Sequence, residues 1–296
     1  MFATLTSAPS RPARSRQSWF RSVAVAAAAS FAITVAPLTA GTAEAAANAT
    51  PSFEVKLNLN ATALSSNAPS SAVRSKFGLG ANGSARAYEY LDTDALDLNG
   101  EGWSVRLRNK DGDPLELNYK KRFAVSGTDL NGSLTTANQA GFDANETSYD
   151  AEVDWGLTRM TLSFSNDKDP GINVDGIGMP SSQNAIAAAV NKIPGKLKDW
   201  RSSNWGKTTL QASRVHGPVT STEWSGTFEG AKSALEILPI HASGGQPAET
   251  VVELSFKAAD FATAKLLRDH AIAIAQANGW LLGSDVLKTN LILTRY

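Results

Sequence analysis

Apolar and polar residues alternate with a period of two along several stretches of the chain, as in β-strands with one apolar and one polar face. The clearest two such stretches are residues 103–110 and 115–123, separated by the turn-forming sequence Asp111-Gly112-Asp113-Pro114. Because Asp-Gly is a typical hairpin turn, the two stretches predict an antiparallel hairpin. Four cations of this hairpin fall on one of its faces: Arg106, Arg108, Lys120 and Arg122.

A cationic face of this kind has two interpretations. It fits the solvated outer side of a sheet, where charged side chains need no partner. It also fits an anion site, because guanidinium groups bind phosphate or carboxylate oxygens in bidentate fashion. The hairpin alone does not choose between these interpretations.

The same period predicts further strands, and a longer period predicts three helices. The additional strands are expected at residues 52–59, 85–90, 149–155, 159–164, 207–215, 233–240, 250–257 and 288–295. Helices are expected at residues 71–76, 182–192 and 260–278, the last with Asp260 as its N-cap and Gly279 just beyond its end. Residues 78–83 match GxGxxG, but a helix precedes them and a strand follows, so we interpret them as a loop and not a dinucleotide site.

The amino-terminal residues have the pattern of an export signal. Four arginines between residues 11 and 21 precede an apolar run at residues 23–35 and the small-residue sequence Ala43-Glu44-Ala45. This order predicts a secretory signal peptide at residues 1–45, with cleavage near Ala45 and a secreted, extracytoplasmic protein. The apolar run is short for a membrane span, so no membrane association is expected after cleavage.

Charge and cysteine content narrow the classes of function. The chain has 28 basic and 28 acidic residues, and without residues 1–45 it has 24 and 27. A mildly acidic protein is not typical of a nucleic-acid binder, so no nucleic-acid partner is expected. Since the chain has no cysteine, disulfides and thiolate metal sites are excluded. The three histidines lack the spacing of a zinc site, and no GxSxG motif supports a serine hydrolase.

Charged residues recur on the polar parity of strands that are otherwise apolar. Besides Arg106, Arg108 and Lys120 they are Glu54, Lys56, Asp150, Glu152, Arg159, Glu253, Lys257 and Lys288. On the strand at residues 149–155, Asp154 shares one face with Asp150 and Glu152. A β-sandwich would turn these residues outward, whereas a closed barrel with a polar lumen would turn them inward. Periodicity leaves both architectures open.

Three short sequences resemble the core of a known family. They are Tyr90-Leu91-Asp92-Thr93, then the stretch from Gly102 to Arg108 (GWSVRLR), and the stretch from Leu117 to Arg122 (LNYKKR). Together they resemble the CYTH domain, or triphosphate tunnel metalloenzyme family, which includes class IV adenylate cyclases and thiamine triphosphatases. The resemblance implies an α+β domain at residues 50–296, built on an eight-stranded antiparallel β-barrel with flanking helices, in which residues 166–203 are an inserted loop and helix segment.

The resemblance also implies which residues form the site. In the family, basic side chains bind triphosphate, and here the corresponding residues are Lys56, Arg106, Arg108, Lys120, Arg159, Lys257 and Lys288. Glutamates hold Mg²⁺ or Mn²⁺, which assigns the metal to Glu54, Glu152 and Glu253. The chain departs from the family motifs at Ser52 and Ser255, where glutamates are expected. Because magnesium prefers carboxylate oxygens, both changes weaken the implied metal site.

Two functional hypotheses follow. The first is an exported protein that binds a triphosphate or polyphosphate in a charged tunnel and, with a divalent metal, hydrolyses it as a triphosphatase-type phosphohydrolase. The second is a non-catalytic secreted binder of a polyanion or an anionic metabolite. In both, the partner is a small or polymeric polyanion. The basic residues suit both hypotheses, while Ser52 and Ser255 favour the second.

Overall fold

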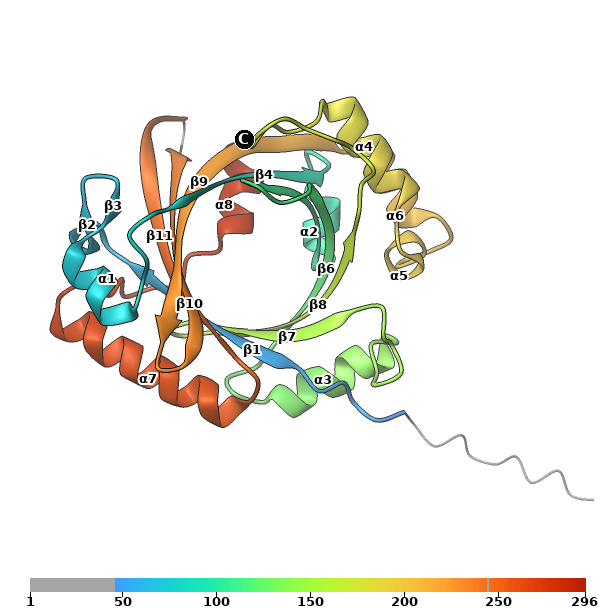
Figure 1. Ribbon diagram of the computed structural model, residues 1–296. Helices are drawn as coiled ribbons and strands as arrows, with labels where there is room; N and C mark the ends of the chain where they lie inside the picture. The colour runs from blue at the N-terminus through green and yellow to red at the C-terminus, as the bar shows by residue number, and fades with distance from the viewer. Residues whose placement is uncertain (1–45, 244) are drawn as a thin grey trace, which may run out of the picture. The chain divides into compact units, whose positions relative to one another are not determined.

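The computed structural model describes residues 46–243 and 245–296, and the signal peptide predicted at residues 1–45 lies outside the described residues. The described chain forms a closed β-barrel with helices packed on its outer side (Figure 1). Around the barrel, the strands follow the order β1 (Ser52–Leu59), β11 (Gly245–Ala258), β10 (Ala231–Ala242), β9 (Arg214–Phe228), β4 (Ser84–Asp92), β5 (Trp103–Lys110), β6 (Glu116–Ala124), β8 (Met160–Lys168) and β7 (Asp150–Trp155). The α+β class and the barrel predicted from the sequence are confirmed.

The strand number and direction differ from the prediction of eight antiparallel strands. The barrel has nine strands, and β1 runs parallel to β7 where the barrel closes, with Ser52 opposite Glu152. All other neighbouring strands of the barrel are antiparallel. A closed ring with an odd number of strands cannot alternate direction throughout, so at least one parallel pair is required.

Two predicted strands are wrong. Residues predicted as a strand at 207–215 form mainly the helix α6 (Trp205–Gln211), and β9 begins only at Arg214. Polar residues and the Gly217-Pro218 step interrupt the alternation of β9, which concealed it in the sequence. Residues 288–295 form the helix α8 (Lys288–Arg295), which buries Ile292 and Leu293. Their β-branched neighbours favour a strand locally, but tertiary burial overrides that preference.

The three predicted helices are confirmed, each with a side-chain N-cap. They are α1 (Ser71–Phe77), α4 (Ser182–Asn191) and α7 (Phe261–Ala277), capped by Ser70, Ser181 and Asp260. The remaining short elements are η1 (Ala61–Ala63), β2 (Leu64–Ser65), β3 (Ala68–Pro69), α2 (Asp97–Gly100), α3 (Leu130–Gln139) and α5 (Gly195–Lys198). None of the helices in the described part of the chain has the length and apolar character needed to cross a membrane.

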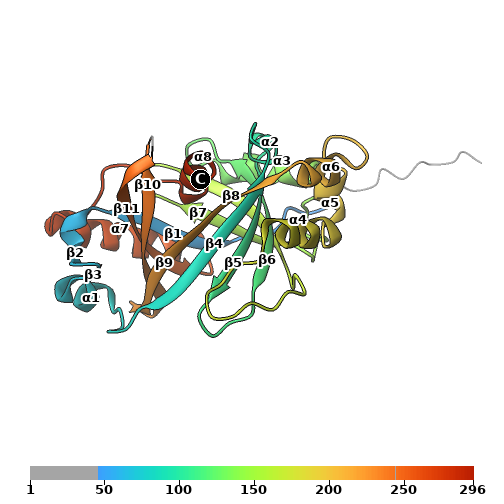
Figure 2. The same ribbon diagram turned by 90° about the horizontal axis from the view of Figure 1, so that it is seen from above.

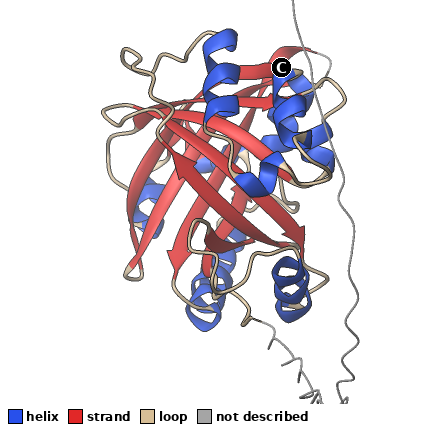
Figure 3. Cartoon of the chain, turned by 90° about the vertical axis from the view of Figure 1, so that its right-hand side faces the viewer, coloured by secondary structure: helices blue, strands red, loops and turns tan. Residues whose placement is uncertain are grey.

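The apolar core lies between the barrel wall and the surrounding helices. From the outer face of the central hairpin, Trp103 packs against Phe142 and Trp200, and the Tyr119 hydroxyl donates to the backbone oxygen of Ala189 in α4. On the other side, α7 packs along β1 and β11 (Figures 1 and 2). In Figure 3 helices lie above and below the strands. The apolar parity of each strand therefore faces outward, and the polar parity is left to the interior.

One carboxyl group on the outer parity of the barrel is buried without a partner. Glu89 of β4 is 3% exposed, and its Oε2 has no hydrogen-bond partner among the described residues. Burial raises the pKa of Glu89 to about 7, because the charged form loses its hydration. At low pH the group is therefore neutral, and deprotonation opposes the fold.

We expect Glu89→Gln to change how stability depends on pH. Because the pKa is higher in the folded protein than the ordinary 4.5, the free energy of unfolding falls as pH rises from about 4.5 to about 7. The shift corresponds to about 3 kcal/mol at most. Urea unfolding should show that the free energy of unfolding falls less between pH 5 and pH 8 in the variant than in the parent. Equal losses in both proteins would contradict the assignment.

Candidate functional site

The interior of the barrel is a cavity lined by charged side chains. Its volume is about 890 Å³. Of the residues predicted from the sequence, it brings together Glu54, Lys56, Arg106, Arg108, Lys120, Glu152, Glu253, Lys257 and Lys288. The inward orientation of the polar parity is thereby confirmed, and the outer-face interpretation of the cationic hairpin is wrong. The inward direction follows from the strands, because Val105 and Leu107 alternate with the two arginines and are buried in the outer core.

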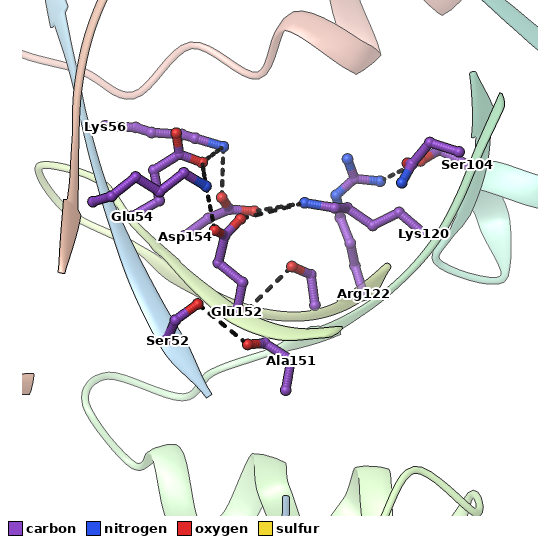
Figure 4. Close-up of polar contacts among 12 residues, drawn as sticks. Ser52, Glu54, Lys56, Ser104, Lys120, Arg122, Ala151, Glu152 and Asp154 are labelled. Carbon is purple, nitrogen blue, oxygen red and sulfur yellow. Dashed lines mark hydrogen bonds and ion pairs between the residues drawn. The ribbon is translucent and has the colours of Figure 1, made fainter. Parts of the chain in front are cut away.

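Three carboxylates gather where β1 and β7 run side by side (Figure 4). One oxygen from each of Glu54, Glu152 and Asp154 lies within 4.8 Å of the others. The parallel register brings them together, since it sets Glu54 opposite Asp154. We refer to these three residues as the acidic cluster. The sequence placed Asp154 on this face without assigning it to the site.

Lysines surround the acidic cluster. The Lys56 Nζ lies 3.0 Å from the Glu54 carboxylate and 2.5 Å from that of Asp154 (Figure 4). The Lys257 Nζ lies 3.2 Å from Glu54 and donates to Glu152, and Lys120 approaches Glu152 at 3.7 Å. Three carboxylates thus face three ammonium groups, so the acidic cluster and these three lysines together have no net formal charge.

These contacts keep Glu54 and Asp154 ionised although both are partly buried. Burial by itself raises the pKa of Glu54, but Lys56 and Lys257 outweigh it and lower that pKa to about 2. Burial also raises the pKa of Asp154, but the charges of Lys120 and Lys56 outweigh this effect and hold that pKa below its ordinary value. The pKa of Lys56 in turn is held well above its usual range, because Asp154 and Glu54 outweigh the effect of its burial. All these groups are charged at neutral pH.

The acidic cluster is compatible with a divalent metal. Its three carboxylates are the oxygen ligands that Mg²⁺ and Mn²⁺ prefer. An ion bound there would take over contacts that Lys56 and Lys257 make with Glu54. The donor set therefore fits a metal, in competition with the lysines.

Glu253, which the sequence also assigned to the metal, lies apart from the acidic cluster. In the pairing of β1 with β11, Lys257 is opposite Glu54, whereas Glu253 is opposite Asn58. Four residues of strand separate these levels, roughly 13 Å. The Glu253 carboxylate instead lies 2.7 Å from the Lys288 Nζ. Glu253 is therefore not one of the carboxylates that gather with Glu54 and Glu152, and its assignment to the metal stays a prediction.

A second polar group surrounds Glu236, which the sequence analysis missed. Its carboxylate accepts hydrogen bonds from the Tyr88 and Ser221 hydroxyls, both at 2.6 Å, and from Lys288. Burial raises the pKa of Glu236, but Lys288 outweighs it and lowers the pKa to about 2. The sequence contains the pattern that could have identified it. Glu236 is a charged residue on the same face of its strand as the apolar residues Ala234 and Leu238.

The arginines of β5 share one carboxylate. Arg106 and Arg108 lie 3.3 and 2.5 Å from Glu116 on the neighbouring strand, and Arg86 pairs with Glu223. The Nε atoms of all three arginines are buried and have no hydrogen-bond partner among the described residues. A buried donor without an acceptor destabilises the folded protein. A ligand with several acceptor oxygens would supply the missing hydrogen bonds on this side of the cavity.

Arg159 is the predicted phosphate-binding residue that does not line the larger cavity. Its side chain is 59% exposed and its Nε lies 4.0 Å from Asp285. It lines a second cavity, of about 210 Å³, which we call the small chamber. The small chamber adjoins the larger cavity, because both are lined by Lys56, Tyr90, Arg106, Asn118, Lys120, Glu253 and Lys288.

Comparisons with known proteins find similar structures only. No family model and no curated protein sequence matches the chain. A putative adenylyl cyclase from Hippeastrum, described as having a dominant triphosphatase activity, is 14% identical, with 81% of this chain and 93% of that chain covered and a TM-score of 0.44. A putative adenylate cyclase from Bacillus halodurans is 11% identical, with 81% and 96% covered and a TM-score of 0.47. Because both TM-scores are below 0.5, the contacts and distances described above carry the conclusions about the site.

We expect the buried ion pairs to make the protein sensitive to acid. The pKa values of Glu54 and Glu236 are lower in the folded state than the ordinary 4.5, so their stabilisation is present above about pH 4.5 and is lost as pH falls towards 2. Glu236→Gln should lower the free energy of unfolding at pH 7 and reduce its further loss between pH 4.5 and 2. Urea titrations across this range measure both effects. The prediction fails if parent and variant lose stability in parallel.

Proposed function

We propose that the barrel interior binds a triphosphate or polyphosphate chain. The observation that carries the proposal is the convergence of six cations from five elements in one cavity. These are Lys56, Arg106, Arg108, Lys120, Lys257 and Lys288. Guanidinium and ammonium groups are the side chains that bind phosphate oxygens. The proposal places the protein outside the cytoplasm, with a polyanion as its partner and without a nucleic-acid or membrane partner.

The charge balance of the cavity explains why the ligand should carry several negative charges. The lining has nine basic residues and eight acidic ones. The basic residues are Lys56, Arg86, Arg106, Arg108, Lys110, Lys120, Lys232, Lys257 and Lys288, and the acidic residues are Glu54, Glu116, Asp150, Glu152, Asp167, Glu223, Glu236 and Glu253. An anion must therefore compete with carboxylates that already hold the cations. A linked chain of phosphates engages several cations at once, which a single small anion cannot do.

Hydrolysis is the catalytic form of the proposal. A divalent cation at the acidic cluster would neutralise phosphate oxygens, which is the main requirement of phosphoryl transfer. In this form Glu54, Glu152 and Asp154 hold Mg²⁺ or Mn²⁺. Arg106 and Arg108 on the opposite part of the wall orient the phosphate chain.

The second candidate is a non-catalytic binder of a polyanion or anionic metabolite. Two observations favour it. Lysines already neutralise every carboxylate of the acidic cluster. In addition, Ser52 and Ser255 stand where the family motifs have carboxylates, which leaves fewer metal ligands.

Arg106→Ala should weaken the binding of tripolyphosphate at least about tenfold. The change removes a charged donor that lines both cavities, and such a hydrogen bond contributes on the order of 1.5–3 kcal/mol. Isothermal titration with tripolyphosphate measures the effect. The control is Lys265→Ala, which removes a cation paired with Asp269 on the exposed side of α7. Equal weakening in both variants, or in neither, would show that the interior is not the binding site.

Glu54→Gln separates the two forms of the proposal. If the protein is an enzyme, the variant loses a metal ligand, and phosphate release from tripolyphosphate with Mg²⁺ should collapse while the fold persists. If it is a metal-free binder, the variant loses a negative charge beside the anion, and affinity should stay level or rise. Two measurements distinguish these outcomes, each made with and without Mg²⁺: phosphate release from tripolyphosphate, and calorimetric titration of the protein with tripolyphosphate. Absence of binding and of release under all conditions would reject both forms.

A further inference from the structure

Each pair of carboxylates in the acidic cluster has one ammonium group within 4.0 Å of both members. The Lys257 Nζ lies 3.2 Å from the Glu54 carboxylate and donates to Glu152. The Lys56 Nζ contacts Glu54 and Asp154 in the same way, at 3.0 and 2.5 Å (Figure 4). A third lysine lies 3.7 and 3.9 Å from the remaining pair. Lysines and carboxylates therefore alternate in a closed ring, which we call the ion-pair ring: Lys257, Glu54, Lys56, Asp154, Lys120 and Glu152.

Lys257 is the most exposed lysine of the ion-pair ring. Its side chain is 52% exposed, against 30% for Lys56 and 14% for Lys120. An exposed ammonium group keeps much of its hydration, so breaking its ion pairs costs little. A more buried cation that lost its carboxylates would be left in the interior without a partner. Lys257 is therefore the lysine that can leave the ring at the smallest cost.

The ammonium group of Lys257 lies where an ion shared by Glu54 Oε2 and Glu152 Oε2 would bind. Magnesium binds carboxylate oxygens at about 2.0–2.1 Å, so an ion held by both oxygens must come this close to each of them. The Lys257 nitrogen already contacts the same two oxygens. Two cations at such short range repel each other strongly. A metal ion can therefore bind to these oxygens only after Lys257 has moved away.

The departure of Lys257 also changes the charge of the ion-pair ring. The complete ring sums to zero, whereas its three carboxylates with Lys56 and Lys120 alone carry one net negative charge. Glu54 keeps its contact with Lys56 at 3.0 Å, so it remains paired. The excess negative charge attracts a divalent cation. The position of one side chain thus decides whether the acidic cluster is neutralised or open to a metal.

We propose that Lys257 is a specificity-determining residue, which closes the acidic cluster to divalent cations as long as it contacts Glu54 and Glu152. The inference rests on the proposed function and names the residue that sets the metal affinity of that site. Phosphate oxygens that accept from Lys257 compete with the two carboxylates for its ammonium group. Binding of a polyanion therefore favours binding of the metal, and the reverse holds by linkage.

Lys257→Gln should bind Mn²⁺ more tightly than the parent does when no anion is present. Removal of a unit charge at such short range from a divalent ion should raise the affinity at least about tenfold. The six-line electron paramagnetic resonance signal of free Mn²⁺ measures binding without any reference to activity. Lys257→Arg, which keeps the charge, should bind Mn²⁺ as weakly as the parent does.

Two further variants show whether the effect is local. Lys232→Gln removes another cation of the larger cavity, one that is not a member of the ion-pair ring, and should bind Mn²⁺ as the parent does. Glu152→Gln in the Lys257→Gln background removes a carboxylate of the acidic cluster and should abolish the gain. Thermal unfolding checks that each variant is folded, and Lys257→Ala replaces Lys257→Gln if the latter does not fold.

The inference is overturned if Lys257→Gln binds Mn²⁺ no more tightly than the parent, if Lys232→Gln produces the same gain, or if the double variant keeps the gain. These titrations contain no phosphate, so their outcome is independent of the proposed function. Failure of the inference together with weaker tripolyphosphate binding by Arg106→Ala would leave the proposed function intact. A gain of Mn²⁺ affinity in Lys257→Gln, with no binding of tripolyphosphate to the parent, would support the role of Lys257 and reject the proposed function.

Discussion

Charges inside a closed barrel stay ionised only when each has a partner, because their hydration is lost on folding. The interior side chains of this protein meet that requirement with one another. Lys56 contacts two carboxylates of the acidic cluster, Lys288 contacts Glu236 and Glu253, and Glu116 is shared by two arginines. The polar lumen is therefore largely neutralised by its own ion pairs, and a ligand that binds these paired cations must replace contacts that already exist. This requirement favours ligands with several linked charges over small single anions.

The arrangement of the strands determines which charges meet. The parallel pairing of β1 with β7 brings Glu54 beside Asp154, and the antiparallel pairing of β1 with β11 brings Lys257 beside Glu54. An odd number of strands makes a parallel pair unavoidable, so the acidic cluster is a direct consequence of how the barrel closes. The same pairings keep Glu253 away from that cluster and leave it to Lys288.

Sequence periodicity could predict the face on which each charged residue lies, but not the partner that it meets. Arg106, Arg108, Lys120 and Glu152 face the interior because they alternate with apolar residues that the helices bury outside. The register brings Asp154, and not Glu253, beside Glu54 and Glu152, and strand register is not visible in a single strand. The helix α8 resembled a strand locally, and only its packing against β4, β9 and β10 explains why it is helical. Lys288 reaches the lumen from this helix and not from a strand.

The lumen contains cations that are paired with carboxylates, and also buried donors that have no partner among the described residues. Cations paired with carboxylates surround the larger cavity, where the Nε atoms of Arg106 and Arg108 have no partner among the described residues. A phosphate chain in the lumen would replace internal ion pairs along its length and supply acceptors for these donors. A crystal structure of the protein with tripolyphosphate tests this account most directly. The account predicts phosphate density in contact with Arg106, Arg108 and Lys120 inside the barrel. Density only on the outer surface, with the interior ion pairs intact, would contradict it.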